Sequence, residues 1–386
     1  MTQESLLGKT DKPVCEMGRA RIWLIRVGLL AFAFLSVVAL PEAMGRAYIW
    51  SRHGVAGKSY GLWKYDSELG AIHASNSYNT HTQTNNFGFR GTEDVLDPKP
   101  SGSLRVICYG GSSTYCYNLA DGQTWPEQLQ KELRTTPGHE QDQVLNGGHI
   151  AWSLGHLFVR AKRDLPALKP DVVVLYVGVN EDSNAFWLQH SGYQLDDLLL
   201  QQRFGVISKN LDQCRWLKRN SVLARFYDYE IKPKLAARTQ PGGKEVETAD
   251  EHQNQSDMES DADFVSSWTF QNYKLMLARM VELIRENGGL PIFVIEAGRL
   301  DIARNRNVLR YSARAADWMR ELKVAVCDPR SVFESHETIE SLFYFTGVHV
   351  SEPGAKLLAH ELARTVTSLS SEAQVSQSAD GSPVTQ

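Results

Sequence analysis

The chain of 386 residues contains little cysteine and little excess charge. Its five cysteines form no Cys-x-x-Cys pair and have no histidine at metal-ligand spacing, which argues against a zinc site. The formal net charge of -4 at pH 7 is too close to balance to indicate nucleic acid as a partner. No internal repeat is visible, so the chain is expected to fold as one main domain with additions at its ends.

Long apolar runs are also absent, with one exception at residues 22–40, where Arg26 is the only charged residue. At about 1.5 Å per residue in a helix, this run roughly matches a hydrocarbon core of about 30 Å. Residues 1–21 are polar and carry four basic residues: Lys9, Lys12, Arg19 and Arg21. We therefore predict a cytoplasmic tail, a transmembrane signal anchor over 22–40 and an exported remainder. The alternative is a signal peptide cleaved near residues 43–45, which would leave a secreted protein.

From residue 104 onwards, short apolar runs alternate with helical patterns. The runs predict five strands, over residues 104–109, 144–146, 172–177, 291–295 and 324–327. The helical patterns lie at residues 125–133, 154–165, 273–284, 308–322 and 352–369. Continuous apolar strands separated by helices are typical of a parallel sheet covered on both faces, so the fold class predicted for residues 101–369 is doubly wound α/β.

Other segments interrupt or flank this pattern. Residues 41–100 show no sustained periodicity and are expected to pack on the α/β domain, with residues 86–91 forming an ordered turn. An insertion over 182–263 follows the third strand and is expected to contain helices at 193–202 and 222–229. Two stretches have the polar composition of disordered chain, at residues 239–263 and 370–386.

Residues suited to acyl transfer follow several predicted strands, and one precedes the last helix. Gly110 and Gly111 permit a tight turn that presents Ser112, the candidate nucleophile, at the carboxyl end of the first strand. Gly148 and Asn180 follow the second and third strands and could donate hydrogen bonds to a developing oxyanion. His349 precedes the last helix, where its imidazole could accept the proton of Ser112.

These residues give the chain a resemblance to the SGNH/GDSL hydrolases, and to their membrane-anchored, exported subgroup. The matching blocks are residues 110–114 (GGSST), 146–148 (NGG), 178–181 (GVNE) and 348–354 (VHVSEPG). The resemblance implies a three-layer α/β/α sandwich of flavodoxin-like type that needs no metal or organic cofactor. It also implies that Ser112 is the nucleophile and His349 the base, with the Ser112 N–H, the Gly148 N–H and the Asn180 side chain as the oxyanion hole.

The chain departs from the family pattern at two positions. Thr346 stands where the family has the aspartate that orients the catalytic histidine, and Gly111 replaces another aspartate. Since threonine supplies no charge, the triad acid is unassigned; a backbone carbonyl or Glu352, the nearest downstream carboxylate, is an alternative. Two neighbouring features are expected to be structural. His149 should be a wall residue, and the pair Glu181 and Asp182 should be a solvated helix start.

The function predicted from these features is that of an exported serine esterase or acylhydrolase. Location and family suggest small acyl esters as substrates, such as O-acetyl groups on an extracellular or envelope polysaccharide. One alternative is an O-acyltransferase that uses the same residues with a sugar hydroxyl in place of water. Another is a non-catalytic glycan-binding or assembly protein that has lost the triad acid.

Overall fold

The computed structural model describes residues 14–79, 81–181, 221–227, 261–298, 310–344 and 347–379. Several predictions fall outside these ranges: most of the insertion, its helix at 193–202, Asp182 and Thr346. The chain divides into two compact units, which are described separately. One comprises Met1–Gly54 and Asn220–Pro241, and the other comprises Val55–Arg219 and Gly242–Gln386.

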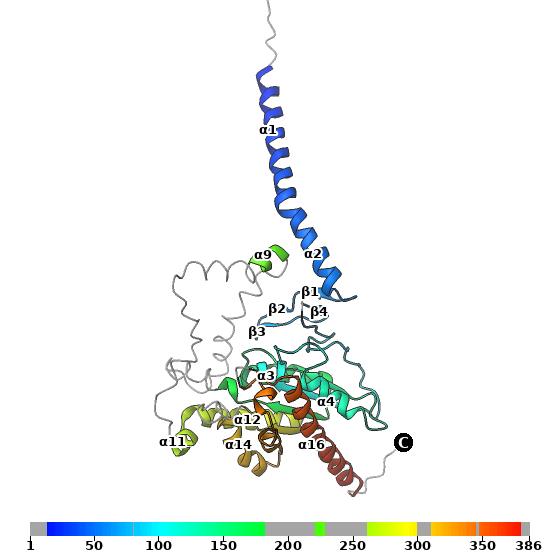
Figure 1. The fold of residues 1–386 in the computed structure, drawn as a ribbon, viewed down its shortest axis with the longest axis vertical. Coiled ribbons are helices and arrows are strands. Elements are labelled where there is room, and N and C mark those ends of the chain that lie inside the picture. The colour runs from blue at the N-terminus through cyan, green and yellow to red at the C-terminus, as the bar shows by residue number, and fades with distance from the viewer. Residues whose placement is uncertain are drawn as a thin grey trace, which may run out of the picture. The chain divides into compact units, whose positions relative to one another are not determined.

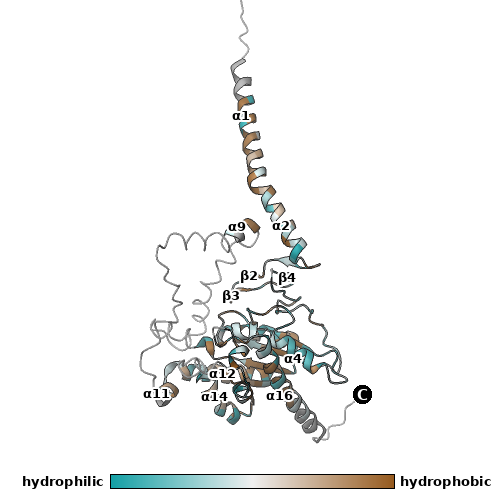
Figure 2. Ribbon diagram, viewed as in Figure 1, coloured by the Kyte–Doolittle hydropathy of each residue, from teal (hydrophilic) through white to brown (hydrophobic). Residues whose placement is uncertain are grey.

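The first unit contains the apolar N-terminal helix. Helix α1 (Val14–Phe34) continues through a π-helical turn, η1 (Leu35–Ala39), into α2 (Leu40–His53). The π turn ends two residues before Pro41, which has no N–H to continue the regular α-helical hydrogen bonding. The stretch Ala20–His53 is long and apolar enough to cross a membrane, although a signal sequence would have the same character. Figure 2 shows the hydrophobic residues along α1.

A short helix of the insertion, α9 (Val222–Phe226), also belongs to this unit. The carboxylate of Glu42 in α2 accepts hydrogen bonds from the Ser221 hydroxyl and from the N–H groups of Val222 and Leu223. An acidic side chain on unpaired N–H groups is favourable at a helix start. The predicted helix at 222–229 is thus present over 222–226, and residues 228–229 lie outside the described part of the chain.

The second unit is built on a five-stranded sheet, seen among helices in the lower part of Figure 1. Its strands are β5 (Arg105–Gly110), β6 (Gln143–Asn146), β7 (Val172–Tyr176), β8 (Leu290–Val294) and β9 (Ala325–Cys327). They lie in the order β6-β5-β7-β8-β9, and all neighbouring pairs are parallel. The predicted five-stranded parallel sheet is confirmed. Strand β5, which lies between β6 and β7, carries the Gly-Gly-Ser turn.

Helices cover both faces of this sheet. They are α4 (Trp125–Leu133), α5 (Leu154–Leu168), α12 (Trp268–Glu286), α14 (Arg310–Glu321) and α16 (Glu352–Ala379). Ile107 and Val173 point into a core with α5, α12 and α14, whereas their neighbours Val106 and Val174 point into a second core with α4 and α16. Because successive strand residues alternate between faces, both cores are apolar and the three-layer α/β/α sandwich is confirmed.

The segment before the sheet contains four short strands: β1 (Ser59–Tyr60), β2 (Trp63–Asp66), β3 (Gly70–His73) and β4 (Ser77–Tyr78). Strands β2 and β3 form an antiparallel hairpin, and β1 pairs with β4 in parallel. Leu69, Phe89 and Val95 are buried in the same core cluster as Ile107. Of the lead segment predicted at residues 41–100, the part from Val55 to Pro100, which keeps this name below, is therefore packed against the sandwich, whereas residues 41–53 belong to helix α2 of the first unit.

Both stretches predicted to be disordered contain helical residues. Helix α16 runs to Ala379, so the prediction of disorder from residue 370 is wrong as far as that residue; residues 370–379 contain neither proline nor glycine to end the helix. Helix α11 (Asp261–Ser266) begins inside the stretch predicted to be disordered, 239–263. The remainder of both stretches lies outside the described residues.

Candidate active site

The nucleophile turn lies at the carboxyl end of β5. The strand ends at Gly110, Gly111 follows, and Ser112 begins the short helix α3 (Ser112–Tyr115). The Ser112 Oγ lies 2.8 Å from the Nε2 atom of His349, 237 positions away in the chain. The structure thus places two of the sequence-predicted site residues at hydrogen-bond distance. This is the contact that a general base needs to accept a hydroxyl proton.

His349 lies in the loop between the 3-10 helix η5 (Ile339–Leu342) and α16. Its carbonyl oxygen accepts a hydrogen bond from the Tyr344 N–H at 2.8 Å. The ring of Tyr117 meets the imidazole edge to face, with 4.8 Å between the ring centroids. Burial lowers the pKa of His349 to about 4, so the imidazole is neutral at pH 7 and able to accept a proton.

Of the residues considered for orienting His349, only Glu352 lies among the described residues. Thr346 lies outside the described residues. Glu352 bonds elsewhere, because its Oε2 accepts from the Gln123 side chain at 2.9 Å and its Oε1 pairs with the Lys356 ammonium at 2.8 Å. The geometry therefore gives no support to Glu352 as a triad member.

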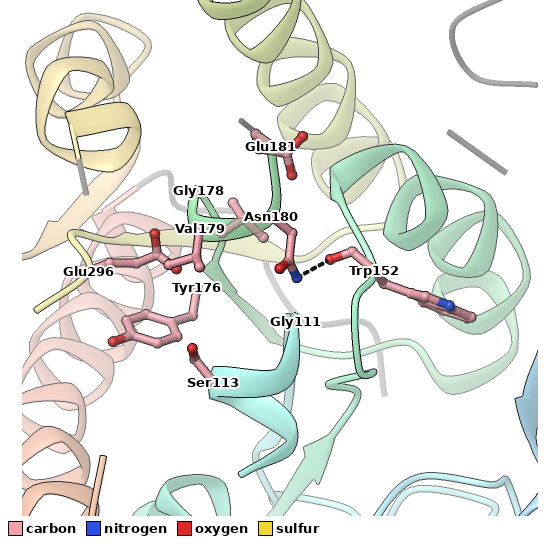
Figure 3. Close-up of a pocket in the computed structure, with 10 residues that line it drawn as sticks. Gly111, Ser113, Trp152, Tyr176, Gly178, Val179, Asn180, Glu181 and Glu296 are labelled. Atoms are coloured by element: carbon pink, nitrogen blue, oxygen red, sulfur yellow. Dashed lines mark hydrogen bonds between the residues drawn. The ribbon is translucent and has the colours of Figure 1, made fainter. Parts of the chain in front are cut away.

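Asn180 lies in the turn that follows β7 and faces the nucleophile turn. Its Nδ2 donates to the carbonyl oxygen of Trp152 at 2.7 Å, drawn as a dashed line in Figure 3. A Cβ atom added to Gly111 would lie only 2.2 Å from this Nδ2. The absence of a side chain at position 111 therefore lets the Asn180 amide rest directly against the backbone that leads into Ser112.

Gly148 is placed differently from what the sequence predicts. Its N–H donates to the side-chain oxygen of Asn146 at 3.0 Å. A Cβ atom here would lie 2.2 Å from the backbone nitrogen of Tyr115, so this glycine allows close packing of the β6 loop on α3. With its N–H already bonded, the geometry gives no support to Gly148 as an oxyanion donor.

One feature of this loop that sequence reasoning missed is the backbone conformation of Ala151. This alanine has a left-handed backbone, with φ +62°, which is uncommon for a residue with a side chain and is often found at functional sites. Within the part of the chain that the structure describes, its N–H makes no hydrogen bond. It directly precedes Trp152, whose carbonyl holds Asn180. Nothing in the sequence singles out an alanine for such a backbone position.

A pocket beside the nucleophile turn is lined by two buried glutamates, together with Gly111, Ser113 and Asn180. Figure 3 shows Glu296 next to Gly178 and Val179, and Glu181 on the other side of Asn180. The Val179 N–H donates to the Glu296 carboxyl, and Glu181 Oε1 accepts from the Leu154 N–H at 2.7 Å. The two side chains thus hold the Asn180 turn to the loops beside it.

Burial governs the protonation of this pair. It raises the pKa of Glu181 to about 7, and it raises that of Glu296 to about 8 with a smaller contribution from the charge of Glu181. The prediction that Glu181 is part of a solvated helix start is wrong, because the residue is 5% exposed. Glu296 was not predicted at all, since one glutamate after an apolar strand is an ordinary sequence feature.

His149 is a wall residue, as predicted. It is fully buried and stacks on Trp152 at 3.8 Å between ring centroids, and on His73 of β3 at 4.4 Å. Burial lowers the pKa of both imidazoles below the usual value, to about 3 for His73, so both rings are neutral. The stack joins the lead segment to the loop that carries Ala151. Among the described residues, no group of three or more His, Cys, Asp or Glu could hold a metal ion.

Comparison with protein families finds a match to the GDSL-like Lipase/Acylhydrolase family over residues 108–357, well over half of the chain. A search of curated proteins finds no match. Among solved structures, an acetylxylan esterase from Geobacillus stearothermophilus is 15% identical, with a TM-score of 0.40, over 68% of this chain and 94% of that one. A lipase/acylhydrolase from Enterococcus faecalis is 13% identical, with a TM-score of 0.40, over 68% of this chain and 95% of that one. At these values the structural likenesses add nothing to the family match.

Proposed function

Since the chain belongs to the GDSL-like lipase/acylhydrolase family, whose members hydrolyse esters, we propose that it is a serine esterase that forms an acyl-enzyme on Ser112. The observation that carries this proposal is the 2.8 Å contact between Ser112 Oγ and His349 Nε2. A protein that kept the fold only to bind glycans would have no need for this contact. The non-catalytic alternative is therefore less well supported.

Each step of the proposed reaction uses the same two side chains. Ser112 Oγ attacks the ester carbonyl carbon while its proton passes to His349 Nε2, giving a tetrahedral oxyanion. Collapse of this intermediate breaks the bond to the alcohol, which leaves with the proton from His349. A water molecule then attacks the acyl group and gives up a proton to His349. Collapse of the second tetrahedral intermediate breaks its bond to Ser112 Oγ, which takes the proton back from His349 as the carboxylic acid leaves.

Three donors are proposed for the oxyanion: the Ser112 N–H, the Ala151 N–H and the side-chain amide of Asn180. The Asn180 amide has two N–H groups, of which one donates to Trp152 and the other remains for the substrate. Ala151 takes the place predicted for Gly148, because the Gly148 N–H is bonded to Asn146. Each such donor contributes roughly 2.7–4 kcal/mol to stabilising the transition state.

The proposed substrates are esters of short acyl groups. The cavity lined by Gly111 and Asn180 has a volume of about 10 Å³, roughly the room that one water molecule needs, so it does not itself hold the acyl group. The preference for an acetyl group over a fatty acyl chain rests on the family and on the proposed location. O-acetyl groups of an extracellular or envelope polysaccharide are the substrate class that we propose.

We propose that the catalytic domain lies outside the cytoplasmic membrane. The stretch Ala20–His53 has the length and hydropathy of a membrane span, and the basic residues in 1–21 favour a cytoplasmic N-terminus. An uncleaved anchor is the preferred form, with secretion after signal cleavage as the alternative.

The decisive test replaces Ser112 and, as a matched control, its neighbour Ser113, whose hydroxyl donates to the Val348 carbonyl instead. Ser112→Ala should lower kcat for p-nitrophenyl acetate by at least about 1,000-fold, whereas Ser113→Ala should stay within about tenfold. A fluorophosphonate should label the wild type at Ser112 and leave Ser112→Ala unlabelled.

Two outcomes would change the assignment. Unchanged turnover in Ser112→Ala would contradict the nucleophile, and a wild type that binds acetylated glycan without being labelled would favour the non-catalytic alternative. If the protein is an acyltransferase, mass spectrometry should find the acetyl groups of the donor on an added polysaccharide instead of in free acetate.

A further inference from the structure

Arg90 lies outside the residues matched by the family, 108–357, in the turn at 86–91 of the lead segment. Its side chain is completely buried, at 0% exposure. Its backbone N–H donates to the Asn146 carbonyl at 3.1 Å, which attaches the lead segment to the end of β6. A charged side chain this deep in the protein requires several partners to compensate for lost hydration.

The partners of Arg90 are carbonyl oxygens at the end of the nucleophile helix α3 and in the turn that follows it. Nη1 donates to Tyr115 O at 2.5 Å and to Cys116 O at 2.7 Å, and Nη2 donates to Leu119 O at 2.5 Å. The guanidinium also lies over the Tyr115 ring, 4.8 Å from its centroid. Carbonyl groups at a helix end lack intrahelical partners, and Arg90 satisfies that of Tyr115 at the end of α3, together with those of Cys116 and Leu119 after it, with one rigid side chain.

The charge of Arg90 has one carboxylate nearby. Asp121 approaches its Nε at 3.4 Å, and the other oxygen of Asp121 accepts from the Gln83 N–H at 2.8 Å. Arg90 therefore contacts both ends of the turn from Tyr115 to Asp121. Within this turn Cys116 has a left-handed backbone, with φ +58°, a conformation that its neighbours must hold in place.

The same turn touches both members of the Ser112–His349 pair. Helix α3 is a single turn, so Ser112 at its start lies only three residues from Tyr115, where Arg90 binds. On the other side, the Tyr117 ring packs on the His349 ring. The Asn118 carbonyl accepts a hydrogen bond from the Tyr344 hydroxyl at 2.9 Å, and Tyr344 in turn donates its N–H to His349 O. A shift of this turn would therefore move serine and histidine relative to each other.

We propose that Arg90 is a positioning residue of the active site, which holds the turn after α3 so that Ser112 and His349 meet. The lead segment then belongs to the catalytic machinery, although it precedes the family domain. This inference rests on the proposed function of Ser112 and His349. Lysine cannot replace arginine here, because one ammonium group cannot reach three carbonyls arranged around a planar guanidinium.

The test compares Arg90→Lys with Arg163→Ala. Arg163 is a matched control, because it also ties the lead segment to the sandwich, through Asp66 and Glu68 of the β2–β3 hairpin, but does not touch α3. For each variant we would measure kcat and KM for p-nitrophenyl acetate, the rate of Ser112 labelling by a fluorophosphonate, and Tm.

Arg90→Lys should lower kcat and the labelling rate together by about 10- to 100-fold with little change in KM, because displacement of about 1 Å at reacting atoms costs about that much. Arg163→Ala should lower Tm and keep kcat within about twofold of wild type. Tyr344→Phe provides a second variant in case Arg90→Lys does not fold. It removes only the bond to Asn118 and should lower kcat and the labelling rate about three- to tenfold.

Several outcomes would overturn the inference. One is that the folded fraction of Arg90→Lys, or Tyr344→Phe if the first does not fold, retains wild-type kcat and labelling rate. Another is an equal loss of kcat in Arg163→Ala, which would show a general effect of loosening the lead segment. Failure of the wild type itself to be labelled at Ser112 would instead refute the proposed function, and this inference with it.

Discussion

At the scale of single residues, Gly111 shows how a departure from the family pattern is accommodated. Aspartate is expected at this position, yet any side chain here would collide with the Asn180 amide, 2.2 Å from the Cβ position. The loss of a side chain thus coincides with a close approach of Asn180 to the nucleophile turn. The residue at position 111 and the placement of the Asn180 amide therefore depend on each other. The sequence alone does not show this dependence.

Gly111→Ala should keep the fold and lose catalytic rate. The colliding atom is the end of a side chain that can rotate away, so Tm should change little. The displaced Asn180 amide would no longer serve the oxyanion, and kcat for p-nitrophenyl acetate should fall about 100-fold. The matched variant is Asn180→Ala. If both changes act through the same amide, the double variant should be no slower than Asn180→Ala, and additive losses would contradict the coupling.

Two buried carboxyls at the same site make stability depend on pH. Glu296 has a pKa raised to about 8 in the folded protein, against an ordinary value of 4.5. The folded state therefore binds a proton that the unfolded state releases as the pH rises through about 4.5. The stability that this proton provides is complete at low pH, declines above pH 4.5 and is lost above pH 8.

Glu296→Gln should remove part of this dependence, since the amide keeps an acceptor for the Val179 N–H and cannot ionise. Between pH 5.5 and 9, the wild type should lose on the order of a few kcal/mol of unfolding free energy, and the variant distinctly less. Urea unfolding at both pH values measures the difference. Glu282→Gln, at an exposed position of α12, is the control. Equal pH slopes for wild type and Glu296→Gln would refute the assignment.

At the scale of elements, the sequence predicted the helix and strand boundaries that depend on neighbouring residues. Helix α4 begins and ends at the predicted residues, because Thr124 and Glu127 form a capping box that fixes its start. The strands were found within about two residues because their apolar, β-branched runs are short and continuous. The end of α16 was missed, since polar composition resembles that of a disordered tail when no proline or glycine marks the boundary.

Contacts between elements were not predictable in the same way. Gly148 has the spacing of an oxyanion donor, but its N–H bonds to Asn146, and the left-handed residue of that loop is Ala151. Glu181 follows the end of a strand, and its position there predicts the solvated start of a helix. The residue is instead buried against the start of α5, where the Leu154 N–H donates to its carboxylate. The partner of Glu181 comes from another part of the chain, and that of Gly148 is a side chain two residues away whose orientation the residue spacing does not record.

At the scale of the whole molecule, the described core of the α/β sandwich lies in residues after Val55. A chain that begins at Val55 should therefore fold without the apolar helix and hydrolyse p-nitrophenyl acetate with kcat within about twofold of the full chain. The full chain should be recovered with membranes, and protease added to intact cells should cleave it. A full chain recovered as soluble cytosolic protein would contradict the proposed location.

The sequence by itself determined the α/β sandwich, the order of its strands along the chain, and the identity of Ser112 and His349 as the candidate pair. These features follow from periodicity, turn residues and spacing, which act over a few residues. Only the tertiary structure decided which atoms meet: the 2.8 Å contact of Ser112 with His349, the Asn180 amide over Gly111, the burial of Glu181 and Glu296, and the hold of Arg90 on the turn after α3. The physical reason is that burial and hydrogen-bond partners depend on how distant segments pack against one another, and residue spacing along the chain does not record that packing.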